Sequence, residues 1–196
     1  MTFAFAFVTR RLAFVAADRR LSGAPDAHGL LATKLCSLET SDGQGFITYA
    51  GAGARSGRKP FEVSEWIERV LRGANRTLNQ TLLEIAAAAE EQRLDSHAAG
   101  HTFGYAGFVD GKPRLHAITS RDEMRMRVKD KNSPVDTGGH TRFRVMNFNL
   151  SDRVNNFALA LGSGAQHFPP HAIMQMMARQ SAKARTKEVA ADRLCA

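Results

Sequence analysis

The sequence predicts an α+β fold, a four-layer αββα sandwich in which two antiparallel sheets lie between two layers of helices. The prediction depends on the order of hydrophobic patterns along the chain, which is strands, two helices, strands and two helices again. Two antiparallel sheets covered by helices on both outer faces satisfy that order. The chain has 196 residues, of which 43% are hydrophobic and 23% are charged. These values fit a single soluble domain over residues 1–196 with a sizeable core.

The first quarter of the chain predicts two pairs of strands separated by a loop. The strands are expected at residues 2–8, 12–18, 34–38 and 45–50. A tight turn at residues 9–11 joins the first pair, and Asp42-Gly43 is the expected turn of the second pair. A glycine-rich bend at residues 51–57 then ends the strand pattern.

Two amphipathic helices are expected next, because apolar residues recur at helical spacing. The stripe of the first helix consists of Val63, Trp66, Ile67, Val70 and Leu71. Gly73 is expected to end this helix. The stripe of the second helix consists of Leu78, Leu82, Ile85 and Ala89. Either Asn75 or Thr77 is expected to cap it.

The second half of the chain repeats the order of strands and then helices. Strands are expected at about residues 102–109, 113–119, 142–148 and 157–161. Asp110-Gly111 is a hairpin turn signal, and the polar segment 120–140 predicts a long loop or an extended hairpin. A Met-rich helix is expected from Pro169 to about residue 182, and a last helix from near Thr186.

The composition argues against several classes of function. The net charge is +8, but the basic residues are scattered and only 8% of the chain is aromatic, so no stretch is typical of nucleic-acid binding. Cys36 and Cys195 lie far apart, which is typical of two reduced thiols. His167 and His171 have two prolines between them, so we expect no metal site there and no cofactor.

The apolar N-terminus predicts a strand rather than a signal peptide. It alternates with period two, and its first arginines, Arg10 and Arg11, follow the apolar part instead of preceding it. No apolar run is long enough to cross a membrane. We therefore expect a cytoplasmic protein that does not bind membranes.

Three residues near the N-terminus have a spacing that points to catalysis. Thr2 follows Met1 directly, Asp18 comes sixteen residues after Thr2, and Lys34 comes sixteen residues after Asp18. Removal of Met1 would leave a hydroxyl and a free α-amine on Thr2. Because an N-terminal amine has a pKa of about 7.7–8.0, roughly a tenth or more of it is neutral at pH 7 and able to accept a proton. A threonine activated by its own amine is a known type of nucleophile.

Five blocks of sequence resemble proteasome β-type subunits and the peptidase subunit of the HslUV protease, which are N-terminal threonine hydrolases. The blocks are Thr2, Ala-Ala-Asp-Arg ending at residue 19, Lys34, Tyr-Ala-Gly-Ala-Gly at residues 49–53, and Leu-Gly-Ser-Gly at residues 161–164. Their order and rough spacing match over about residues 2–190. The resemblance implies the Ntn-hydrolase type of four-layer sandwich.

The resemblance also implies a set of site residues. Thr2 would be the nucleophile, and Asp18 would be the carboxylate that orients Lys34. Gly51 would supply the backbone donor for the oxyanion, and Ser163 would lie near the α-amine. Gly53 is an alternative to Gly51 as the oxyanion donor, since the match allows a slip of two residues. Leu21 and Tyr49 would contact the substrate side chain.

Three functions are compatible with this sequence. The first is a threonine endopeptidase that cuts peptides or unfolded proteins inside a homo-oligomeric ring, fed by an ATP-dependent unfoldase. The second is a catalytically silent ring subunit, which a retained Met1 and the lack of an Asp-x-x-Ser-Gly-like stretch near Ala196 would favour. The third is an N-terminal hydrolase that acts on a non-peptide amide. The number of subunits per ring and the peptide preference stay open.

Overall fold

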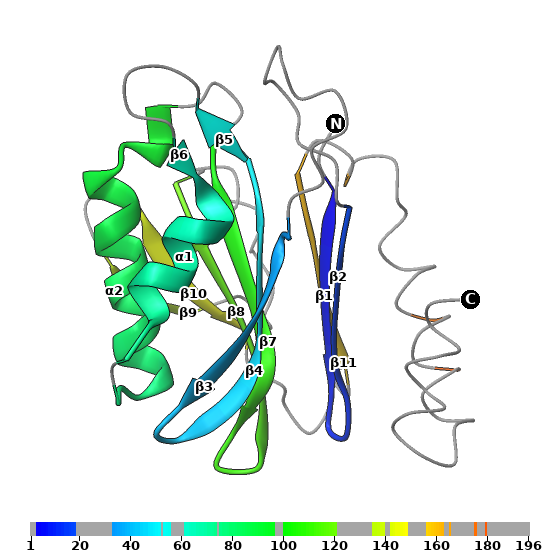
Figure 1. Ribbon diagram of the computed structural model, residues 1–196. Coiled ribbons are helices and arrows are strands. Elements are labelled where there is room, and N and C mark those ends of the chain that lie inside the picture. Colours follow the sequence, from blue (N-terminus) through cyan, green and yellow to red (C-terminus); the bar gives the residue numbers. More distant parts are fainter. Residues whose placement is uncertain are drawn as a thin grey trace.

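A computed structural model gives the fold of the chain, and Figure 1 shows it. The structure describes residues 3–18, 33–51, 53–55, 61–73, 75–96, 100–120, 135–139, 142–148, 156–162, 165, 175 and 179. The strands in these ranges are β1 (Ala4–Thr9), β2 (Ala13–Ala17), β3 (Leu35–Thr40), β4 (Gly43–Ala50), β5 (Ala54–Arg55), β6 (Phe61–Glu62), β7 (Thr102–Val109), β8 (Lys112–Thr119), β9 (Val135–Gly139), β10 (Arg144–Phe148) and β11 (Asn156–Leu161). The helices are α1 (Val63–Leu71), α2 (Leu78–Glu91) and the short 3₁₀ helix η1 (Leu94–Ser96).

The strands form two large antiparallel sheets. One has three strands in the order β11-β1-β2, and the other has six in the order β3-β4-β7-β8-β10-β9. The two residues of the β7–β8 turn, Asp110 and Gly111, both have positive φ angles, 49° and 72°. This conformation suits the predicted Asp-Gly hairpin, because both central residues of a type I′ turn need positive φ. The tips of the β3–β4 and β7–β8 hairpins lie at the same end of the molecule (Figure 1).

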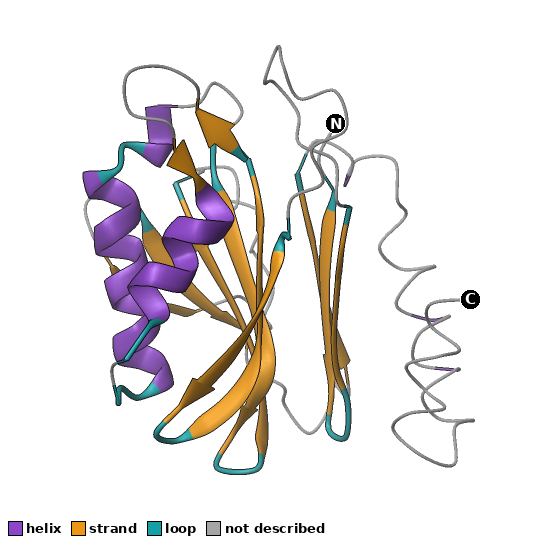
Figure 2. Ribbon diagram, in the orientation of Figure 1, coloured by secondary structure: helices purple, strands orange, loops and turns teal. Residues whose placement is uncertain are grey.

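Both α-helices begin and end close to the predicted residues. The last helical residue of α1 is Leu71, and Gly73 follows it with φ of +76°. Thr77 caps α2 through a capping box with Gln80, so of the two caps predicted for α2 the structure selects Thr77. Figure 2 shows α1 and α2 side by side against one face of the six-stranded sheet.

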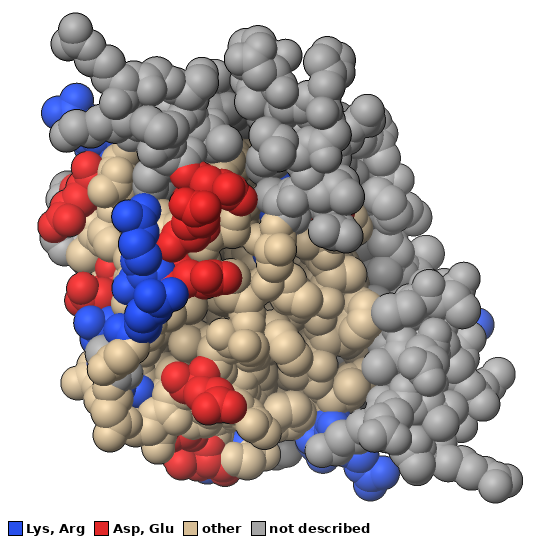
Figure 3. Space-filling view, in the orientation of Figure 1, with Lys and Arg blue, Asp and Glu red and all other residues tan. Residues whose placement is uncertain are grey.

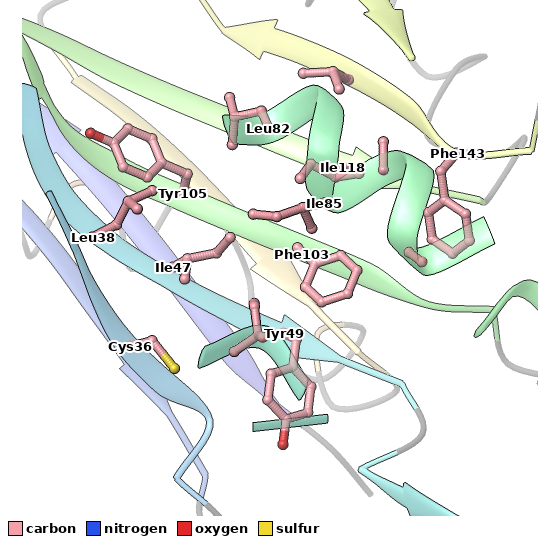
Figure 4. Close-up of a cluster of buried hydrophobic side chains, with 14 of the residues drawn as sticks. Cys36, Leu38, Ile47, Tyr49, Leu82, Ile85, Phe103, Tyr105, Ile118 and Phe143 are labelled. Atoms are coloured by element: carbon pink, nitrogen blue, oxygen red, sulfur yellow. The ribbon is translucent and has the colours of Figure 1, made fainter. Parts of the chain in front are cut away.

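Apolar side chains fill the spaces on both faces of the six-stranded sheet, because successive residues of a strand point to opposite faces. One core lies between this sheet and the helices, where Ile47, Phe103 and Ile118 face Leu82 and Ile85 (Figure 4). The second core lies between the two sheets. Its buried residues include Ala4, Ala6, Val8, Val15, Ala106, Leu115, Ala117, Leu159 and Leu161.

The prediction of a four-layer sandwich is wrong. The described residues are mostly in strands, and they form three layers: the two α-helices, the six-stranded sheet and the three-stranded sheet. The prediction was based on the order of elements, and that order does not determine which face of a sheet a helix covers. Gln175 and Arg179 are helical, but the rest of the helices predicted after residue 169 lies outside the described residues.

Smaller elements also differ from the expectation. The turn between β3 and β4 consists of Ser41 and Asp42, whereas Gly43 already pairs with Thr40 in the ladder. In the segment 120–140, where a long loop or an extended hairpin was expected, residues 135–139 are strand β9, which forms an antiparallel pair with β10. The short pair of β5 and β6 was not predicted. Neither α1 nor α2, the α-helices of the described part of the chain, is long and apolar enough to cross a membrane.

Candidate active site

The predicted site residues that the structure describes lie at one end of the two sheets, the upper end in Figure 1. In the three-stranded sheet, Ala4 pairs with Ala17 on one side and with Leu161 on the other. The start of β1 therefore lies between the ends of β2 and β11. In the six-stranded sheet, Leu35 pairs with Thr48, so the start of β3 lies beside the end of β4.

Asp18 directly follows β2 and holds the start of β1. Its backbone N–H donates to the Phe3 carbonyl oxygen at 2.9 Å. Its carboxylate oxygen Oδ2 accepts a hydrogen bond from the Phe3 backbone N–H at 3.1 Å. Because this pair continues the β1–β2 ladder by one residue, the position of Phe3 relative to the carboxylate is fixed by the sheet.

Lys34 precedes β3 and forms an ion pair with Asp18. Its ammonium donates a hydrogen bond to Oδ1 of the carboxylate. The lysine side chain is 1% exposed and that of Asp18 is 30% exposed. A buried ammonium is costly without a counter-ion, so the carboxylate is needed to keep the charge of Lys34 inside the protein. One carboxylate therefore joins Lys34 from the six-stranded sheet to Phe3 from the three-stranded sheet.

Gly51 follows β4 directly and has φ of +140°, a conformation that side-chain-bearing residues rarely adopt. A Cβ atom at this position would lie 2.5 Å from Nδ1 of His101 and 2.9 Å from the Gly100 carbonyl oxygen. The site therefore requires glycine for two reasons, the backbone conformation and the lack of space. The alternative donor, Gly53, lies two residues further on and is buried.

Tyr49 lies in the core on the helix side of the six-stranded sheet. It is 1% exposed, and its ring lies 5.8 Å from that of His101 and 6.4 Å from that of Phe103. Burial raises the pKa of the Tyr49 hydroxyl to about 12, and the neighbouring Ser64 side chain opposes that rise. The expected contact of Tyr49 with a substrate side chain stays a prediction, and in this structure the residue packs in the core.

Three of the predicted residues, Thr2, Leu21 and Ser163, lie outside the described residues. Their chain neighbours are described. Phe3 is the next residue after Thr2, and Gly162, which precedes Ser163, follows the end of β11 with φ of +88°. Because Leu161 pairs with Ala4, Gly162 lies close to the start of β1.

His101 was not among the predicted residues. It precedes β7, is fully buried and lies next to Gly51. The sequence signal that could have found it is a histidine placed directly before a strongly apolar strand. Within the described ranges, no three His, Cys, Asp or Glu side chains gather in a way that could hold a metal ion.

Solved structures of Anbu proteins resemble this chain. Anbu (ancestral beta-subunit) from Yersinia bercovieri has a TM-score of 0.52 and 12% identity, over 96% of this chain and 77% of that chain. Anbu from Hyphomicrobium sp. strain MC1 has a TM-score of 0.49 and 16% identity, over 95% of this chain and 67% of that chain. Its Gly-1 mutant has a TM-score of 0.49 and 15% identity, over 93% and 75% of the two chains. No protein-family model and no curated protein matches the sequence.

These findings correct the resemblance stated from the sequence. The chain was expected to belong with proteasome β-type subunits and the HslUV peptidase subunit, but the Yersinia bercovieri structure that it resembles belongs to Anbu, a proteasome-like but distinct family. The motif blocks are short, and their spacing is too weak a signal to separate related families. At 12% identity, the likeness to the Yersinia bercovieri structure concerns the fold alone.

Proposed function

We propose that this protein is an N-terminal threonine hydrolase that cleaves peptide bonds, with Thr2 as its nucleophile. The observation that carries the proposal is the double role of Asp18. Its carboxylate accepts the Phe3 N–H at 3.1 Å and also binds the buried ammonium of Lys34. Thr2 is joined to Phe3 by a peptide bond, so a fixed positive charge lies close to where the first strand begins. An alkoxide that forms on a nearby hydroxyl is stabilised by such a charge.

The chemistry follows from the groups of Thr2 once Met1 is removed. The Thr2 hydroxyl oxygen attacks the substrate carbonyl carbon, and the Thr2 α-amine accepts the hydroxyl proton. The amine passes this proton to the leaving nitrogen as the peptide bond breaks. A water molecule then hydrolyses the resulting ester and regenerates the hydroxyl and the amine. Lys34 keeps the amine neutral by like-charge repulsion and favours the alkoxide.

Gly51 supplies the backbone donor for the oxyanion in this proposal. A backbone N–H that points at the developing negative charge stabilises an oxyanion. Ser163 acts near the α-amine and assists proton transfer, and Leu21 and Tyr49 contact the substrate side chain.

The fold supports the same proposal at a coarser level. Anbu, described as an ancestral beta-subunit, shares the arrangement of sheets with this chain at a TM-score of 0.52. By analogy, the substrate is a peptide or an unfolded protein, and the chains assemble into a homo-oligomeric ring. An ATP-dependent unfoldase is the partner that would deliver folded substrates to such a ring.

The test is intact mass spectrometry before and after treatment with a peptidyl epoxyketone. This reagent needs both the threonine hydroxyl and the free α-amine to form its adduct. We expect a chain without Met1 that takes one adduct. Thr2→Ala should take none, whereas Thr2→Ser keeps a hydroxyl and should still react. Ser37→Ala, which changes an exposed residue of β3, is the matched control for handling and folding.

Three outcomes would contradict the proposal. A chain that has lost Met1 but takes no adduct has the required amine and lacks the reactivity. A chain that keeps Met1 and takes no adduct has no catalytic amine, and the structural ring subunit would then be the better function. An adduct of equal yield in Thr2→Ala would place the nucleophile elsewhere.

A further inference from the structure

We infer that His101 is a positioning residue, whose imidazole holds the Gly51 peptide in the orientation that the oxyanion requires; this inference rests on the proposed function. Nδ1 of His101 lies 2.5 Å from the position of a Cβ built on Gly51, and the ring carbon Cγ lies 2.9 Å from it. The imidazole therefore occupies the space that a side chain at position 51 would fill. Rotation of the Gly51 peptide toward this side is blocked by the ring.

The imidazole is itself held in place on several sides. Its ring lies 4.6 Å from the Phe103 ring at 48°, and 5.8 Å from the Tyr49 ring at 16°. Phe103 in turn packs against Trp66 of α1, with the ring centres 5.9 Å apart. Figure 4 shows Tyr49 and Phe103 projecting from neighbouring strands on the helix side of the sheet. His101 is fully buried within this aromatic cluster.

The backbone of His101 is also fixed. Its N–H donates to the Ser120 hydroxyl at 3.3 Å, and its carbonyl oxygen accepts the Ser120 N–H at 3.3 Å. The register of the sheet pairs Ala50 with Thr102, so Gly51 and His101 are the next residues outward on two hydrogen-bonded strands. The contact between them therefore depends on the sheet and not on a flexible loop.

This arrangement matters for catalysis because an oxyanion donor acts only when it points at the developing charge. Removal of one such donor costs about 10²–10³ in rate. Loss of the imidazole would displace the Gly51 N–H without deleting it, so we expect a smaller loss, about tenfold or more. Because the oxyanion contact forms in the transition state, the loss should fall on the rate of reaction and not on binding.

The experiment measures the kinetics of labelling by a peptidyl epoxyketone, followed by intact mass. The maximal rate of labelling should fall about tenfold or more in His101→Ala, while the half-saturating concentration stays within about threefold. His116→Ala is the matched control, because His116 is also a buried histidine but contacts Tyr105 on a different part of the sheet. His116→Ala should lose stability and keep the maximal rate within about threefold of wild type.

A second measurement tests the contact between the two residues directly. Gly51→Ala places a Cβ against the His101 ring and should lose stability in urea unfolding. In the His101→Ala background that collision is relieved, so the double variant should unfold at a higher urea concentration than additive effects would give. Additive effects would show that the ring does not hold position 51 and would overturn the inference.

The remaining outcomes separate the inference from the proposed function. A wild type that takes no label overturns the proposed function, and the inference with it. A labelled wild type with a folded His101→Ala variant of unchanged maximal rate overturns the inference alone. If His101→Ala does not fold, Gly51→Ala replaces it: a maximal rate within about threefold of wild type in that variant would overturn the inference.

Discussion

Replacement of Asp18 by asparagine should destabilise the protein strongly, although the side chain keeps its size. The asparagine oxygen can still accept the Phe3 N–H, which the carboxylate accepts at 3.1 Å in the wild type. The negative charge beside the Lys34 ammonium is lost, and that ammonium belongs to a side chain that is only 1% exposed. The change therefore isolates the charge–charge interaction from the hydrogen bond to β1.

The size of the effect follows from the burial of the two partners. Breaking a buried ion pair by removal of one partner costs about 3–5 kcal/mol, because a buried charge is left without a counter-ion. The Asp18 side chain is 30% exposed, so water can replace part of what the carboxylate provided. We expect a loss of about 2–3 kcal/mol in the free energy of unfolding.

Urea unfolding at pH 7.5 measures the effect in Asp18→Asn, Lys34→Met and the double variant. The double variant should be more stable than Asp18→Asn, because it no longer buries an unpaired ammonium. Asp110→Asn, the same change at an exposed turn, is the control and should stay within about 0.5 kcal/mol of wild type. A cost below about 1 kcal/mol for Asp18→Asn would refute the argument that this carboxylate compensates a buried charge.

Three further predictions concern other parts of the fold. Burial, and to a lesser degree the charge of Arg114, lowers the pKa of His116 from 6.5 to about 4. The contribution of this group to the stability of the folded state is therefore present above pH 6.5 and is lost as the pH falls toward 4. Urea unfolding of the wild type should therefore show a loss of about 2–3 kcal/mol between pH 7.5 and 4.5 that is absent from His116→Phe; an equal loss in both would contradict it. Thr77→Ala removes the capping box of α2 and should cost about 1 kcal/mol in the same assay, with no change expected for the exposed Ser37→Ala. Gly107→Ala places a Cβ 2.3 Å from the Tyr105 hydroxyl and 2.4 Å from the Gln44 carbonyl oxygen, so its melting temperature should fall further than that of Gly73→Ala, where the added Cβ meets no atom within 4 Å.

Most individual elements were predictable because their signals are local. The strand expected at about residues 102–109 is β7 at those bounds, and Asp110-Gly111 suits the turn that follows. The stripe from Val63 to Leu71 gives α1 in the same way. Signals of this kind depend on side-chain periodicity within a few residues and need no knowledge of the rest of the fold.

The layers of the fold were harder to predict, because they depend on contacts between distant parts of the chain. Sequence order does not state which face of a sheet a helix covers, and this is why the four-layer prediction failed. In the same way, strand β9 has little apolar pattern, and its sequence Val-Asp-Thr-Gly-Gly resembles a loop. It becomes a strand by pairing with β10.

The site shows the same division between local and distant information. The resemblance stated from the sequence implied that Asp18 orients Lys34, and the structure joins the two in one ion pair. The close approach of His101 to Gly51 had no signal in the spacing, since fifty residues separate the two in the sequence. It appears only once β4 and β7 are paired, which places Ala50 opposite Thr102.

The Asp18 carboxylate connects the stability of the fold to the chemistry proposed for it. It joins Phe3, which precedes β1, to Lys34, which precedes β3, so it links the two sheets at the end where these strands begin. A buried ion pair is weak evidence for stability as such, because well-packed apolar residues often serve a fold equally well. The structure nevertheless keeps an ammonium inside, paired with the carboxylate that also accepts the Phe3 N–H. That arrangement costs desolvation energy that an apolar pair would avoid, and stabilisation of a developing negative charge is the use that we propose for it.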